Sequence, residues 1–190
     1  MPATTGVRVD RSIPLLVLGL GNVLCADDGL GVAAVERLRE GYEPAGGTLV
    51  LDGGTLGLSL LPYLEEARNA ILVDAIRDDA APGSLVRLEG EDVAPAVAAR
   101  LSVHQIGVVD LLDGARWLGR TPERLVLHGI VPESLDLSVI RSASVERSLP
   151  ELVRRVVEEA EALGFPFRPL SRHEPRPETS FRAGARALGL

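Results

Sequence analysis

Three aspartates and one histidine are the residues of this sequence whose types and positions fit metal chemistry. Asp28, Asp52 and Asp74 each come directly after or soon after an apolar run of strand length, and His104 lies in the first turn of a predicted helix. Parallel strands bring their carboxyl ends to one edge of a sheet, so we expect the three acids to approach one another there. Carboxylates held close together repel, and a bound cation is the simplest compensation.

Two carboxylates and an imidazole suit zinc or nickel better than magnesium or copper(I). At a helix N-terminus the helix dipole disfavours imidazolium, which keeps the ring of His104 neutral and available as a ligand. A lone histidine more often packs or hydrogen-bonds locally, but the companion acids favour the ligand interpretation. His128 lies within a strand and is expected in the core, whereas His173 is expected in solvent. From the residues alone, the hypothesis is a resident zinc that polarises a water for peptide hydrolysis.

The acidic pair Asp27 and Asp28 stands directly before a helix predicted over residues 30–40. Helix capping and the helix dipole explain one aspartate there, and the second needs another role. The GLG turn at residues 19–21 supplies two glycines of a dinucleotide-binding fingerprint, but the third position is Leu24. Two acids would also face the pyrophosphate at the helix start, so nucleotide binding is disfavoured.

These residues need a scaffold of alternating strands and helices, which the hydrophobic pattern provides. Such alternation predicts a three-layer α/β/α fold, of the phosphorylase/hydrolase-like type, around a mostly parallel central sheet of about five strands. The predicted strands are Ile13–Gly19, Thr48–Leu51, Ala70–Val73, Leu125–Leu127 and an exposed or edge strand at Ser84–Leu88. The predicted helices are Leu30–Glu40, Leu58–Ala67, a long helix opened by a capping box at Ser102–Gln105, and Val145–Leu163.

The chain is long enough for one domain with a substantial core, which we place at residues 13–164. Residues 1–12 carry no periodicity and are expected to form a flexible leader. Residues 165–190 are rich in proline and arginine and are expected to form a disordered tail.

Composition removes several classes of function. A formal charge of −7 disfavours nucleic acid and anionic membranes as partners, and all 20 basic residues are arginine, so no lysine can form a Schiff base. The single cysteine, Cys25, rules out internal disulfides and fits a reducing cytoplasm. Its acidic neighbours disfavour a reactive thiolate. No run reaches the roughly 18 apolar residues of a membrane span. We therefore expect a cytoplasmic monomer with no organic cofactor.

Six motifs, in order along the chain, resemble one family. They are GLGNVLCADDGLGV, LDGGTLG, ILVDAI, APGSLVRL, SVHQIGVVDLL and GIVPESL, and they extend from about residue 15 to residue 163. Together they resemble the hydrogenase maturation proteases, the endopeptidases that mature nickel–iron hydrogenases. The first twelve residues and the arginine-rich tail lie outside the resemblance.

The resemblance implies an α/β/α fold and one proteolytic cut, made after nickel insertion, that removes a C-terminal extension from the precursor of the hydrogenase large subunit. It also implies that nickel carried by the substrate is recognised by Asp28, Asp74 and His104, and that Asp52 in the DGGT motif serves substrate recognition or activity. The glutamate of some relatives is aspartate at residue 28, and Val103 replaces a proline of some relatives. The metal then belongs to the substrate, whereas the residues alone suggest resident zinc.

Two carboxylates and one histidine leave coordination positions open for water or for ligands of the precursor. No serine or cysteine triad is visible as an independent hydrolytic device. Three hypotheses therefore stand at this stage: a nickel-dependent processing endopeptidase, a non-catalytic escort of the metallated large subunit, and an independent zinc peptidase.

Overall fold

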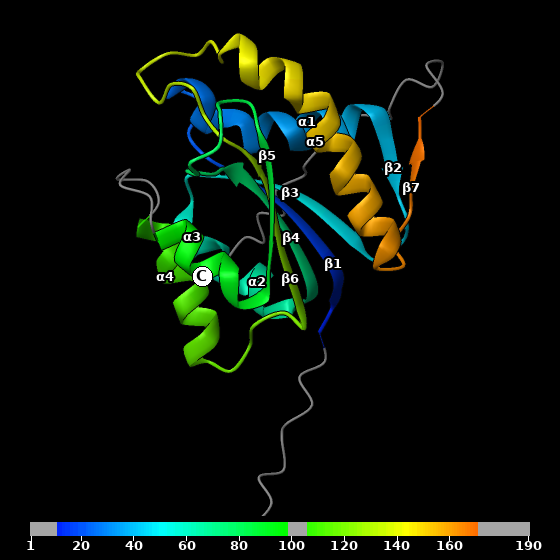
Figure 1. Cartoon of the computed structure of the whole chain (residues 1–190). Helices are drawn as coiled ribbons and strands as arrows, with labels where there is room; N and C mark the ends of the chain where they lie inside the picture. The colour runs from blue at the N-terminus through cyan, green and yellow to red at the C-terminus, as the bar shows by residue number, and fades with distance from the viewer. Residues whose placement is uncertain (1–10, 99–105, 171–190) are drawn as a thin grey trace, which may run out of the picture.

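The computed structural model describes residues 11–98 and 106–170, and a five-stranded sheet forms its centre (Figure 1). The strand order is β3-β1-β4-β6-β5, and only β5 runs antiparallel to its neighbour. The strands are β1 (Ile13–Leu20), β3 (Thr48–Gly54), β4 (Ala67–Ala75), β5 (Leu85–Glu89) and β6 (Arg124–Ile130). This arrangement confirms the predicted five-stranded, mostly parallel sheet with an edge strand after residue 83.

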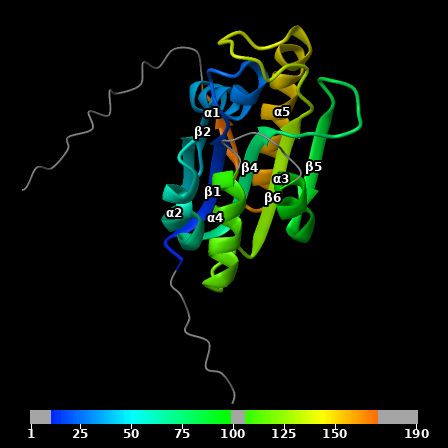
Figure 2. The ribbon, with the colours of Figure 1, turned by 90° about the vertical axis from the view of Figure 1, so that its left-hand side faces the viewer.

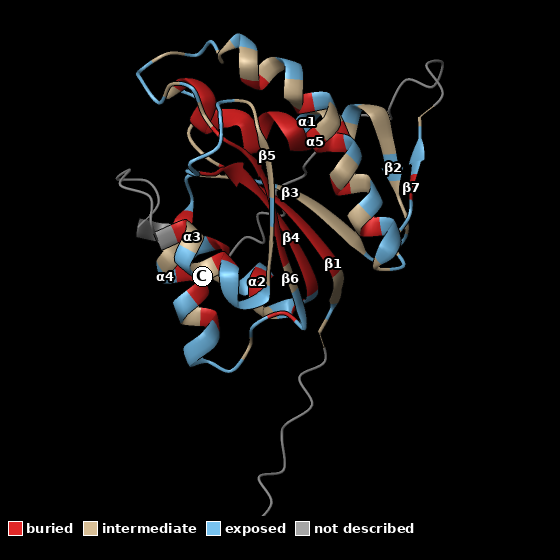
Figure 3. Cartoon of the chain, viewed as in Figure 1, coloured by how far each residue is buried: buried red, intermediate tan, exposed pale blue. Residues whose placement is uncertain are grey.

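The central strands are apolar along most of their length because helices cover both of their faces. Leu15 to Leu18 of β1 are fully buried, as are Ala70 to Leu72 of β4 (Figure 3).

Helices α1 and α5 pack on one face of the sheet, and α2, α3 and α4 pack on the other (Figures 1 and 2). The helices are α1 (Leu30–Gly41), α2 (Leu61–Glu66), α3 (Val93–Ala98), α4 (Ile106–Trp117) and α5 (Ala143–Ala162). Three single turns of 3-10 helix precede helices: η1 (Ala26–Gly29), η2 (Gly57–Leu60) and η3 (Gly90–Asp92). Two apolar cores result, one on each side of the sheet, so the three-layer α/β/α architecture is confirmed.

A second, two-stranded sheet was not predicted. β2 (Tyr42–Pro44) lies between the predicted helix that ends at Glu40 and the predicted strand that begins at Thr48, where no strand was expected, and β7 (Phe167–Pro169) lies in the segment expected to be a tail. The two pair antiparallel, and the side chain of Phe167 is buried against the α1/α5 core. The domain boundary expected at residue 164 is therefore too early. Residues 1–10 and 171–190 lie outside the described residues, so a leader and a tail there stay predictions.

Helix α1 rests directly on the ends of two strands because glycine occupies position 31. A Cβ atom there would lie 2.2 Å from the carbonyl oxygen of Val73 and 2.3 Å from that of Leu20. Gly21 has φ of +119°, and a Cβ atom there would lie 1.8 Å from the carbonyl oxygen of Asp28. These glycines thus bring η1 and the start of α1 against the carboxyl ends of β1 and β4.

Candidate functional site

Asp28, Asp52 and Asp74 all lie near the carboxyl-terminal ends of the central strands, where an open α/β fold usually keeps its site. The predicted approach of all three to form a metal site is not found among the described residues. Gly19 of β1 is paired with Asp52 of β3 on one side and with Val73 of β4 on the other. Asp74 follows Val73, and η1, which carries Asp28, contacts β4. Asp28 and Asp74 therefore lie on contacting elements at one end of the central strands.

Asp28 is the most unusual of these acids, because its carboxylate is buried and incompletely hydrogen-bonded. Its side chain is 3% exposed, and Oδ2 accepts a hydrogen bond from the backbone N–H of Asn22 at 2.8 Å. Oδ1 is buried and has no hydrogen-bond partner among the described residues. Leaving a buried carboxylate oxygen without a donor is costly, so this atom is suited to receive a cation or a donor from a ligand.

Asp74 is also buried, with 2% of the residue exposed. Its Oδ1 accepts from the backbone N–H of Ala75 at 2.7 Å. It stands beside Gly129 of β6, where a Cβ atom would lie 2.3 Å from the carbonyl oxygen of Asp74. The close approach of β6 fixes the backbone that carries this carboxylate.

Asp52 has a different environment. It lies within β3, is exposed, and shares the sheet level of Gly19 and Val73. Side chains alternate between the faces of a strand, so Asp52 points to the same face as Val73 and to the opposite face from Asp74. The side chains of Asp52 and Asp74 therefore lie on opposite faces of the sheet, which the sequence alone did not indicate.

His104 and the predicted capping box lie outside the described residues, and α4 is described from Ile106 onward. Within the described part of the chain, no three side chains of His, Cys, Asp or Glu lie close enough together to hold a metal ion. Asp28 and Asp74 alone would supply two oxygen ligands. A ligand set with an imidazole thus depends on His104 and stays a prediction.

Asp27 is a structurally important acid whose role sequence reasoning missed. It is fully buried, and its oxygens accept three backbone N–H bonds from the segment between β6 and α5: Glu133 at 2.8 Å, Ser134 at 3.0 Å and Ser142 at 2.7 Å. Burial alone would raise the pKa of Asp27, but these donors outweigh it and hold the pKa below its ordinary value. No side chain caps α1, so capping does not explain either aspartate.

His128 is buried in β6, which confirms the expectation that it belongs to the core. Its Nε2 lies 3.0 Å from Oε2 of Glu159 in α5. Burial lowers the pKa of His128, although the Glu159 carboxylate opposes this. The hydrogen bonds from Arg87, at 2.7 and 2.9 Å, lower the pKa of Glu159 to about 2. This group joins β5, β6 and α5, and His128 is in register with Val73 of β4, the residue before Asp74.

The fold and the acids at its edge place this chain in the class of α/β/α proteins with a carboxylate site beyond the central strands. The family model described as hydrogenase maturation protease, HycI, matches residues 32–159. The chain therefore belongs to the hydrogenase maturation protease family. Relatives whose names state an activity are proteases or endopeptidases, which are hydrolases.

Individual relatives agree with this assignment. The chain is 43% identical to the hydrogenase expression/formation protein HupD of Rhodobacter capsulatus over 72% of this chain and 62% of that protein. It is 35% identical to the hydrogenase 2 maturation protease of Escherichia coli K12, over 75% and 88% of the two chains. The solved structure of the hydrogenase maturating endopeptidase HybD from E. coli superposes with a TM-score of 0.79 at 34% identity, covering 83% of this chain and 98% of that chain.

A more distant structure retains the fold. The [NiFe] hydrogenase maturation protease HybD from Thermococcus kodakarensis matches with a TM-score of 0.64 at 29% identity, over 78% of this chain and 99% of that one. No helix in the described ranges combines the length and the apolar character needed to cross a membrane.

Proposed function

We propose that this protein is the endopeptidase that removes the C-terminal extension of a nickel–iron hydrogenase large-subunit precursor after nickel insertion. Family membership supports the reaction class. The observation that carries the proposal is Asp28, a buried carboxylate whose Oδ1 lacks a donor and which lies at the sheet edge that also carries Asp74. An incoming cation would supply the missing partner.

The metal in this proposal is cargo of the substrate. Asp28 and Asp74 would contact it with oxygen ligands, and His104 would add an imidazole, a mixed set that nickel accepts. Three protein ligands leave coordination positions for the precursor's own ligands. Asp52, which is exposed on β3, is assigned to shaping the surface that the precursor meets. The protein is assigned to the cytoplasm as a monomer without an organic cofactor.

The test is processing of the cognate large-subunit precursor by the purified protein, with the precursor either loaded with nickel or free of it. Gel shift and mass spectrometry of both fragments locate the cut. A single C-terminal cut that requires nickel is the expected result. Equal cleavage of the metal-free precursor would overturn the role of nickel. Binding without cleavage would favour an escort, and turnover of unrelated peptides by protein that retains zinc through dialysis would favour a zinc peptidase.

A further inference from the structure

Large apolar side chains are exposed on the segment between β6 and α5, residues 131–142, which we call the edge loop. The exposed fractions are 86% for Leu137, 77% for Ile140 and 70% for Val139. Val23 and Leu24, which are about half exposed, lie on the neighbouring segment that leads into η1. Ordered apolar groups that stay in solvent commonly mark a contact surface.

The edge loop is joined to the segment of the candidate site. The backbone N–H of Ser138 donates to the carbonyl oxygen of Leu24 at 2.9 Å, and that of Ala26 donates to the carbonyl oxygen of Ser138 at 2.6 Å. Asp27 bonds both ends of the loop, at residues 133–134 and at Ser142. The apolar surface is therefore continuous with the segment that carries Asp28.

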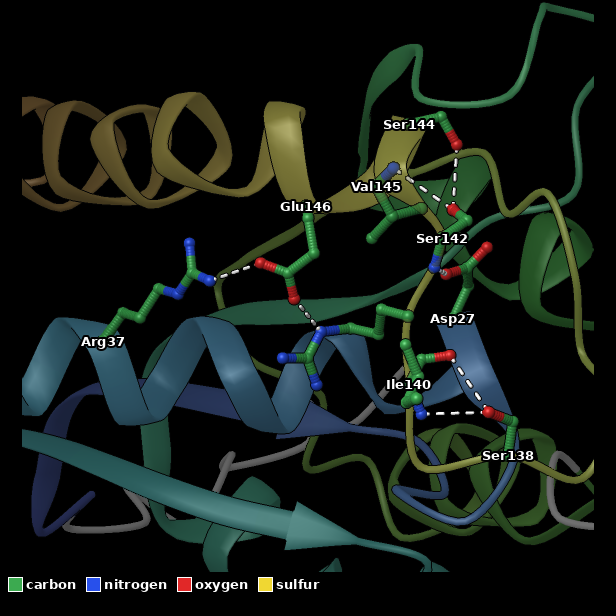
Figure 4. A network of polar contacts seen from close by, with 9 residues as sticks. Asp27, Arg37, Ser138, Ile140, Ser142, Ser144, Val145 and Glu146 are labelled. Atoms are coloured by element: carbon green, nitrogen blue, oxygen red, sulfur yellow. Dashed lines mark hydrogen bonds and ion pairs between the residues drawn. The ribbon is translucent and has the colours of Figure 1, made fainter.

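The loop backbone is held in place along its length. Figure 4 shows Ser138 hydrogen-bonded to both backbone groups of Ile140, at 3.0 and 3.2 Å, and Ser142 capping α5 at the N–H of Val145. The apolar side chains thus project from a fixed backbone. A partner would order few additional groups on this side, which lowers the entropic cost of binding.

The charged residues of the edge loop are engaged within the protein. Glu133 accepts from the hydroxyl of Ser144 at 2.6 Å, and Asp136 accepts from that of Ser134 at 2.9 Å. Arg141 is paired at 2.6 Å with Glu146. Glu146 also forms an ion pair with Arg37, as Figure 4 shows. Glu133 and Asp136 are exposed and keep their charge, so the surface offers a partner apolar contacts with two carboxylates beside them. The large exposed side chains are apolar, which suits an apolar partner segment.

We infer that the edge loop, together with Val23 and Leu24, is the surface on which an apolar segment of the precursor protein docks while its metal site meets Asp28. The inference rests on the proposed function. The precursor is the expected partner because the edge loop is hydrogen-bonded to the segment that carries Asp28. A precursor whose metal reaches Asp28 is therefore brought against this loop. Leu137 and Ile140, the two most exposed side chains of the loop, are then determinants of substrate affinity.

The test compares two double variants by their binding to the nickel-loaded precursor and by the kinetics of processing. Leu137→Ser with Ile140→Ser removes apolar surface from the edge loop. Trp117→Ser with Leu118→Ser is the matched control, because these side chains are 88% and 58% exposed at the far end of α4. Thermal unfolding verifies that both proteins are folded.

We expect the loop variant to raise Kd and KM at least about ten-fold with little change in kcat, since burial of two aliphatic side chains contributes at least that much. The control should have the same Kd and KM as the unsubstituted protein. The conservative double variant Leu137→Met with Ile140→Leu should retain the affinity for the precursor. Unchanged Kd and KM in the folded loop variant would overturn the inference. So would a dimer of the unsubstituted protein that the loop variant abolishes, because a second copy would then cover the surface.

Failure of the proposed function would look different. If the unsubstituted protein binds the precursor without cutting it, and the loop variant loses binding, the docking surface stands and the protease assignment fails. If the unsubstituted protein does not bind the precursor at all, the docking inference fails as well.

Discussion

At the scale of single residues, the adjacent acids Asp27 and Asp28 have opposite kinds of environment. Asp27 has hydrogen-bond donors to both oxygens, all from a segment more than 100 residues away. Asp28 keeps one buried oxygen without a partner. Burial is the same for both, so hydrogen bonding distinguishes a structural carboxylate from one available to a ligand.

Asp28→Asn is expected to abolish processing, with a loss of about 100-fold or more, while the melting temperature changes little. The amide oxygen can still accept from the N–H of Asn22, but the charge offered to a cation disappears. Precursor processing and thermal unfolding of the same preparation check this. A large loss of stability would instead indicate that the carboxylate serves the fold.

Asp27→Asn is expected to affect stability, in contrast to Asp28→Asn, which is expected to affect processing. The amide nitrogen of asparagine cannot accept the backbone N–H hydrogen bonds that one carboxylate oxygen of Asp27 accepts. We expect this loss to lower the free energy of unfolding by about 1–3 kcal/mol, and the melting temperature by about 2–4 °C for each kcal/mol. The lowered pKa of Asp27 means that its contribution is present near neutral pH and is lost as pH falls below about 4, through the folded-state pKa. Denaturant unfolding at pH 7 and pH 3 measures both effects; equal stability of the variant at pH 7 would contradict them.

At the scale of elements, close packing of α1 on the strand ends determines where η1 stands. The third glycine of a dinucleotide fingerprint is absent, and the glycines present are explained by contacts within the protein. A Cβ atom at Gly19 would lie 2.3 Å from the carbonyl oxygen of Gly31, so the strand and the helix meet at paired glycines.

Gly31→Ala is expected to destabilise the protein by about 3 kcal/mol or more, because the added methyl group meets backbone atoms that cannot rotate away. Gly41→Ala, in the same helix, is the control, since nothing lies within 4 Å of its Cβ position and alanine favours a helix by up to about 1 kcal/mol. Chemical denaturation of both variants tests the contrast. Similar stability of the two would show that α1 does not depend on this contact.

The contact between β6 and α5 predicts a pH dependence. The pKa of His128 is lowered in the folded protein, so the unfolded chain takes up its proton first as pH falls. Stability should therefore decline below about pH 6.5, toward the folded-state pKa of His128. His128→Gln keeps a donor for Glu159 and removes the titration, and it should reduce the slope of stability between pH 7 and pH 5. Identical slopes in both proteins would contradict the assignment.

At the scale of the whole molecule, the pairing of β2 with β7 joins the segment after α1 to the segment after α5. Pro44 is paired with Phe167, and the backbone N–H of Leu170 donates to the carbonyl oxygen of Gly41 at 2.8 Å. Phe167 is 7% exposed in the core shared by α1 and α5. These contacts close the α1/α5 layer.

A chain that ends at Gly164 is expected to be less stable than one that ends at Leu170, by about 3–5 kcal/mol, because it lacks the buried ring of Phe167 and the pairing with β2. The comparison isolates β7, since both chains lack everything after residue 170. Thermal and urea unfolding of the two proteins provide the measurement. Equal melting temperatures would mean that β7 adds nothing to the layer.

Local patterns in the sequence were enough to predict the five strands of the central sheet, the main helices beside them, the two-sided burial of that sheet and the position of Asp28 and Asp74 at the ends of its strands. These features follow from local hydrophobic periodicity and from the common direction of parallel strands. Four features became evident only in the folded protein: the role of Asp27, the fixed edge loop, the pairing of β2 with β7, and the opposite facing of Asp52 and Asp74. Each depends on contacts or register between segments distant in sequence, and local patterns of residue type carry no record of such contacts.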